Sequence, residues 1–144
     1  MFERLQKPLH LIELRWSGKQ TLVVVVRHVV PNPRPEIIGR HVRDIMSAPI
    51  VYAESETFEI SFPRYMTFMV SDEACFPPRY DNVFEGTSFR RYQKSQLLNF
   101  VEKSAFSHVQ THPLFHYGIY CPNDLVDVVT TKPPEISYIG MTNK

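Results

Sequence analysis

Two residues that could exchange a proton, His116 and Asp127, lie near the end of the chain. A histidine beside a carboxylate is a common pair for general acid–base catalysis, and Tyr117 could add a hydroxyl to the same site. Glu59 would join them if its strand lay alongside. Such a set would suit a hydrolase-type enzyme or a small-ligand site. A buried His–Asp pair that only stabilises the fold uses the same residues, so the pair alone does not establish catalysis.

The turn between these two residues decides whether they meet. Strands are predicted over residues 115–121 and 125–131, with a turn at Pro122-Asn123-Asp124 between them. A turn centred on Asn123 and Asp124 sets residue 116 opposite about 131, and residue 120 opposite about 127. In this register His116 and Asp127 are not direct cross-strand neighbours. The spacing therefore argues against a coupled pair and, with it, against an enzyme.

A second pair, Arg90 and Tyr92, could contact nucleic acid, because guanidinium groups hold phosphates and aromatic rings stack on bases. Side chains alternate along a strand, so Arg90 and Tyr92 share one face while Phe89 and Arg91 share the other. Only Arg90 with Tyr92 could form an RNA-binding surface. The alternative, which we favour, is that these arginines form ion pairs with acidic residues such as Glu85.

Other sequence signals for binding or catalysis are weak. The turn at Glu85 and Gly86 could hold an anion through its backbone amides. No phosphate-binding loop and no dinucleotide-binding glycine motif is present. Ser95 lacks the sequence context of a nucleophile elbow. Neither Cys75 nor Cys121 lies in a recognisable catalytic signature, and we expect both to be free thiols.

Three histidines recur at a spacing of four residues, at positions 108, 112 and 116. This spacing would stack metal ligands on one face of a helix. Pro113 would interrupt that helix, and no acidic residue stands between the histidines. The sequence therefore predicts no metal site, and nothing in it calls for a cofactor.

The first half of the chain favours strands. Residues 9–16 and 21–30 are predicted to form a hairpin around Gly18. The apolar run from Leu22 to Val26 is typical of a central strand that is covered on both faces. Residues 57–62 and 65–70 also have strand character, and Pro63-Arg64 is expected to be a tight turn between these two antiparallel strands. Residues 71–86 are predicted as a long loop.

Two helices are predicted between the strands, at about 35–47 and 96–106. Pro35 suits the first position of a helix, and Ser95 can cap the second helix, whose Leu98 and Val101 would face the core. A strand over residues 87–92 precedes it. Because the elements do not alternate as regular βαβ units, we expect a β-rich α+β fold with a mainly antiparallel sheet. Residues 1–144 are expected to form a single domain.

Composition is that of a globular protein with little net charge. The chain has 16 Lys and Arg against 15 Asp and Glu, giving a formal net charge of +1. The charges are segregated, since residues 1–50 carry a net +4 and residues 51–85 a net −5. We expect these segments to neutralise each other after folding. With no membrane-length apolar run and no signal-peptide pattern, we expect a cytoplasmic protein without membrane contact.

Residues from about Phe58 to Ile136 resemble a group of small bacterial proteins to which no activity is assigned. The resemblance covers just over half of the chain and rests on Phe58-Glu59-Ile60-Ser61-Phe62, Glu85-Gly86, Phe89-Arg90-Arg91-Tyr92-Gln93-Lys94-Ser95, Leu97-Leu98, His116-Tyr117-Gly118-Ile119-Tyr120-Cys121, Asn123, Asp127-Val128-Val129 and Pro134-Glu135-Ile136. It implies no residue roles.

The residues therefore favour a small, non-enzymatic, cytoplasmic binding or interaction protein. Its partner is left open between another protein and a small ligand, and nucleic acid is not expected. One alternative is a small-ligand-binding protein or hydrolase-type enzyme that uses His116 and Asp127. The other is an RNA-binding module that uses Arg90 and Tyr92. The candidate binding residues are Arg90, Tyr92, His116, Tyr117, Asp127 and Glu85.

Overall fold

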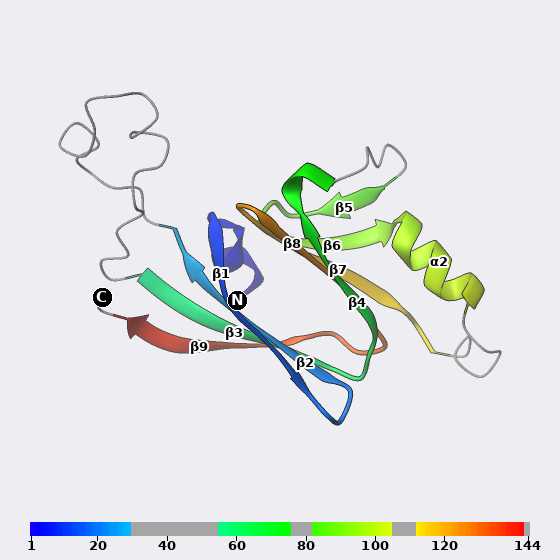
Figure 1. Cartoon of the computed structure of the whole chain (residues 1–144), viewed down its shortest axis with the longest axis horizontal. Helices are drawn as coiled ribbons and strands as arrows, with labels where there is room; N and C mark the ends of the chain where they lie inside the picture. Colours follow the sequence, from blue (N-terminus) through cyan, green and yellow to red (C-terminus); the bar gives the residue numbers. More distant parts are fainter. Residues whose placement is uncertain (30–54, 76–81, 105–111, 143–144) are drawn as a thin grey trace.

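The computed structural model describes residues 1–29, 55–75, 82–104 and 112–142. Within them the strands form two antiparallel sheets that pack as two layers (Figure 1). Sheet A has the order β1-β2-β3-β9, and sheet B has the order β4-β8-β7-β6-β5. The strands of sheet A are β1 (Leu9–Ser17), β2 (Thr21–His28), β3 (Ser55–Pro63) and β9 (Glu135–Thr142). Those of sheet B are β4 (Tyr65–Asp72), β5 (Val83–Glu85), β6 (Phe89–Lys94), β7 (Phe115–Cys121) and β8 (Asp124–Thr130).

Helical structure is sparse in the described residues. They contain one α-helix, α2 (Gln96–Ser104), and the 3-10 segments η1 (Phe2–Gln6) and η3 (Glu73–Cys75). The helix predicted over about 96–106 is confirmed as α2 up to Ser104. Its last two residues, like the helix predicted over 35–47, lie outside the described residues. The described chain is therefore β-rich and antiparallel, as predicted, but it shows one α-helix where two were expected. None of its helices is both long and apolar enough to cross a membrane.

The main core lies between the two sheets. Along β2, Leu22, Val24 and Val26 point inward at alternate positions and are fully buried, because side chains of a strand alternate between its faces. They meet inward residues of sheet B such as Ile119 and Val128. The prediction of β2 as a central strand is confirmed, since it pairs with β1 on one side and β3 on the other.

The chain passes from one sheet to the other at Pro63-Arg64. The predicted antiparallel pairing of residues 57–62 with residues 65–70 is wrong, because β3 pairs with β2 and β9, and β4 pairs with β8. Arg64 has a φ of 56°, a left-handed conformation that redirects the chain at this point. Strand character is local, but the choice of partner is made by the whole fold, and both sides of β3 are already occupied.

Two strands were not predicted. β5 is a three-residue exposed strand that lies in the segment predicted as a loop, and it exists because β6 offers it an edge. β9 follows Pro134 and pairs with β3 at the edge of sheet A. β9 depends on a partner that is distant in sequence, and β5 is very short. Local sequence patterns detect both kinds of strand poorly.

The β7–β8 hairpin has a tighter turn than the sequence predicted. Cys121 pairs with Asp124, so Pro122 and Asn123 form a two-residue turn in which Asn123 has a φ of 72°. Asparagine adopts this left-handed conformation more readily than most residues. The register is consequently shifted by two residues from the expected one. His116 lies opposite Val129, and residue 118 lies opposite Asp127.

Candidate functional site

Four of the six predicted binding residues lie together on the outer face of sheet B, the face turned away from sheet A. Arg90 and Tyr92 of β6 lie opposite Gly118 and His116 of β7, and Gly118 lies opposite Asp127 of β8. The two-residue shift makes His116 and Asp127 diagonal neighbours, whose side chains are within reach. They are not directly opposite each other, as predicted, but the expectation that they would not form a pair is wrong.

A chain of hydrogen bonds joins His116 to residues on both sides. Its Nε2 lies 2.8 Å from Asp127 Oδ1, and its Nδ1 lies 2.6 Å from Ser95 Oγ. The amide of Leu98 donates to the same Ser95 oxygen at 3.0 Å, which makes Ser95 the N-cap of α2 as predicted. We call Ser95, His116 and Asp127 the relay.

The direction of these bonds follows from the chemistry of the groups. An ionised carboxylate only accepts, so Nε2–H of His116 donates to Asp127. In a neutral imidazole Nδ1 then accepts, and the hydroxyl of Ser95 donates to it while accepting from Leu98. Ser95, His116 and Asp127 are 4%, 0% and 3% exposed, so each bond is shielded from water. A complete set of partners is what makes this polar burial tolerable.

Tyr92 covers the relay from the solvent side. Its ring stacks on that of His116 with centroids 4.0 Å apart and planes 9° apart. Gly118 permits this position, because a Cβ there would lie 2.9 Å from Tyr92 Cε2. Tyr92 is itself only 7% exposed. Its ring is therefore poorly placed to stack on a nucleic-acid base, which removes the main support for an RNA-binding surface.

Arg90 occupies the open part of the same face. Its guanidinium carbon lies 4.4 Å from the ring centroid of Phe84 and 4.6 Å from that of Tyr120, so the group is held between two aromatic rings. Its Nε donates to the carbonyl oxygen of Thr87 at 2.8 Å. The ion pair with an acidic residue that the sequence suggested is replaced here by aromatic packing.

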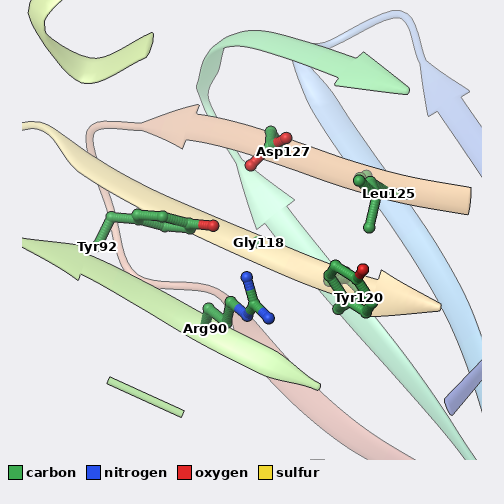
Figure 2. A pocket seen from close by; sticks show the side chains of 8 residues that line it. Arg90, Tyr92, Gly118, Tyr120, Leu125 and Asp127 are labelled. Carbon is green, nitrogen blue, oxygen red and sulfur yellow. The ribbon is translucent and has the colours of Figure 1, made fainter. Parts of the chain in front are cut away.

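A small hollow lies beside Arg90, over Gly118. Figure 2 shows the guanidinium group of Arg90, the hydroxyl of Tyr92 and the carboxylate of Asp127 turned toward this space. Its volume of about 10 Å³ is close to the minimum that a single water molecule requires. We call it the Arg90 hollow. Donors line one side and an acceptor lines the other, so it suits a group that can both accept and donate a hydrogen bond.

A larger cavity of about 310 Å³ lies at the start of α2. It is lined by residues 93–96 and by Leu98, Asn99 and Glu102. Ser95 thus belongs both to this cavity and to the relay, whereas Asp127 lines the Arg90 hollow. The relay spans the distance between the two spaces.

The other two predicted residues do not join this site. Tyr117 points inward, where it stacks on Phe89 with ring centroids 5.7 Å apart, and burial raises the pKa of its phenol. Glu85 forms an exposed ion pair with Arg91 at 3.0 Å, as the ion-pair interpretation predicted for this carboxylate. Gly86, with a φ of 94°, serves the turn between their strands.

Sequence reasoning missed the relay role of Ser95 and the contributions of Phe84, Gly118 and Tyr120. Alternation along β7 gives a usable signal for Gly118 and Tyr120, because they share a face with His116. No comparable signal exists for Ser95, since its contact with His116 depends on where α2 packs against sheet B. Its capping position was recognisable, but its partner was not.

Comparison of the chain with family models, with curated proteins and with solved structures finds no match. The geometry of the site itself is therefore the basis for its interpretation.

Proposed function

We propose that this protein acts by binding, and that it takes a small, neutral, polar ligand at the Arg90 hollow. The observation that carries the proposal is the placement of Arg90 between Phe84 and Tyr120, with its guanidinium turned toward a space shared with Asp127 (Figure 2). An arginine that is held in place before binding loses little side-chain entropy when it forms hydrogen bonds.

The charges around the hollow select the kind of ligand. Arg90 would attract an anion, but the carboxylate of Asp127 lines the same space and opposes one. A hydroxyl or a primary amide satisfies both, because it can accept from Arg90 and donate to Asp127. The class of ligand we propose is therefore one that presents a hydroxyl or amide group, rather than a phosphate or carboxylate.

The size of the hollow indicates how such a ligand would lie. Only one polar group fits into about 10 Å³, so the remainder must rest on the surrounding surface. Phe84 is 41% exposed beside Arg90, and Tyr120 and Leu125 flank the hollow. A ligand with an apolar face next to its hydroxyl, as in a saccharide or a polyol, would use both features.

A titration followed by amide NMR tests this proposal. Glucose, glycerol and acetamide at millimolar concentrations should shift the backbone amide signals of Arg90, Gly118 and Tyr120. Acetate and inorganic phosphate should not. Arg90→Leu should abolish the shifts, and the matched variant Arg91→Leu should retain them, because Arg91 lies on the opposite face and pairs with Glu85.

Two outcomes would reject the binding mode. One is a response to acetate or phosphate alone, which would mean that Asp127 does not govern the site. The other is a set of shifts that persists in Arg90→Leu.

Single-stranded RNA should not bind appreciably at physiological salt. Tight, salt-sensitive binding that depends on Tyr92 would favour the RNA-binding alternative instead.

A further inference from the structure

The relay holds a serine, a histidine and an aspartate in the hydrogen-bonding order that activates a nucleophilic hydroxyl. We propose that Ser95 is such a nucleophile, and that it accepts an acyl group from a small carboxylic ester in the cavity at the start of α2. This activity goes beyond ligand binding at the Arg90 hollow and uses a different space. It rests on the two short contacts of His116, at 2.6 Å to Ser95 and 2.8 Å to Asp127.

Each member of the relay is placed for a separate task. The Ser95 hydroxyl donates to Nδ1, so its proton already faces a base. Asp127 accepts from Nε2, which fixes the tautomer and would stabilise the imidazolium once it forms. The stacked ring of Tyr92 holds the imidazole plane in position from the other side. Such a set is recognised by geometry and roles and not by the spacing of its members in the sequence. Here Nδ1 faces the serine and Nε2 faces the aspartate, the reverse of the serine-protease arrangement.

The surroundings indicate where a substrate would enter. Ser95 is 4% exposed and lines the cavity, whereas His116 is fully buried and does not line it, so an ester in the cavity would reach Ser95 first. The cavity that Ser95 lines, about 310 Å³, lies at the small end of the range for ligand sites. Polar side chains, including those of Gln96 and Asn99, form much of its wall. A short-chain ester fits this volume better than a lipid or a peptide.

The reaction balances with water as the only co-reactant. As Ser95 Oγ bonds to the carbonyl carbon, its proton passes to His116 Nδ1 and the carbonyl π electrons move to oxygen. Collapse of this intermediate breaks the carbon–oxygen bond to the alcohol, which leaves with the proton from Nδ1. A water molecule then attacks the acyl-serine and gives its proton to Nδ1. The acid departs, and Ser95 recovers the proton.

A fluorophosphonate probe tests the proposal on the full-length protein. Attack by Ser95 forms an oxygen–phosphorus bond and expels fluoride, and intact mass with peptide mapping identifies the modified residue. We expect one adduct, on Ser95, that forms on the native protein and not in guanidinium chloride. Asp127→Asn should slow its formation on the order of 10²-fold or more, because a neutral amide stabilises the imidazolium much less than the carboxylate does. Ser104→Ala, a change at the exposed end of α2, should react like the unaltered chain.

The alternative is that Ser95 serves only as the helix cap. The absence of an adduct on the native protein would establish that alternative, and so would an adduct on another residue or an unchanged rate in Asp127→Asn. The mapping on the unaltered chain does not depend on the stability of any variant. Failure of the Arg90 titration would leave this result unaffected, because the fluorophosphonate reacts with a residue that does not line the Arg90 hollow.

Discussion

The two faces of sheet B are both buried near β7 and β8, but they are buried in different ways. The inner face presents Ile119, Val126 and Val128 to sheet A, in a continuous apolar core. The outer face buries His116 and Asp127 beneath Tyr92, next to the relay partner Ser95. Neighbouring residues on one strand are therefore stabilised differently: apolar burial stabilises those on the inner face, and hydrogen bonds stabilise those on the outer face.

Apolar burial on the inner face has no preferred direction, and its contribution grows with the area removed from water. Buried polar groups on the outer face contribute only while each donor keeps its acceptor. The inner face should accordingly respond to lost volume, and the outer face to a lost partner at nearly constant volume. Cys121 shows that the inner face disfavours charge, because burial there raises the pKa of its thiol to about 12 and keeps the thiol neutral.

The largest effect is expected on the inner face. Ile119→Ala should lower the free energy of unfolding by roughly 2–5 kcal/mol, since it removes a fully packed side chain between the sheets. Urea denaturation measures this change. The matched variant Ile139→Ala, at a residue that is 53% exposed, should change stability little. Comparable losses in the two variants would contradict the assignment of the core.

On the outer face, removal of a hydrogen-bond partner should matter more than loss of volume. Asp127→Ala leaves the Nε2–H of His116 without its acceptor and should cost roughly 1–3 kcal/mol. Asp127→Asn keeps an acceptor oxygen in nearly the same volume and should cost less. Urea denaturation measures the difference between the two variants, which combines the lost acceptor with the lost side-chain volume. Equal losses would mean that neither the accepting oxygen nor the side-chain volume matters, and that the negative charge, which both variants remove, sets the contribution of Asp127.

Gly118→Ala tests the position of the Tyr92 ring. The added methyl group would lie 2.9 Å from Tyr92 Cε2, so the ring must move off His116 at a cost of about 1 kcal/mol. Thermal unfolding and the NMR shifts of the His116 ring should both report the displacement. Gly18→Ala is a suitable control, since no atom lies within 4 Å of a Cβ at that position. An unchanged His116 signal would show that the stacking is not enforced by Gly118.

The smallest effect is expected for a polar contact outside both faces of sheet B. Arg4 hydrogen-bonds to Glu56 on sheet A and lowers the pKa of that carboxyl below its ordinary value of 4.5. The ion pair therefore stabilises the folded state above pH 4.5, and this contribution is lost as pH falls through the lowered pKa. Glu56→Gln should be slightly less stable than the unaltered chain at pH 7 and equally stable at about pH 2. A difference that persists in acid would point to packing and not to charge.

The sequence by itself determined much of the local structure. Strand character and turn residues located β1, β2, β7 and β8, and the serine before an apolar helical stripe located the start of α2. Alternation also determined that Arg90 and Tyr92 share a face. These features follow from contacts between residues that are near one another in the chain, so a local pattern is enough to predict them.

Only the tertiary structure decided which residues meet. A register shift of two residues leaves every side chain on its predicted face but changes its neighbours, so alternation could not show that His116 lies beside Asp127. The crossing between sheets at Pro63-Arg64 and the contact of Ser95 with His116 have the same origin. Pairing between distant segments depends on competition among all strands and on the packing of α2, which no single segment encodes.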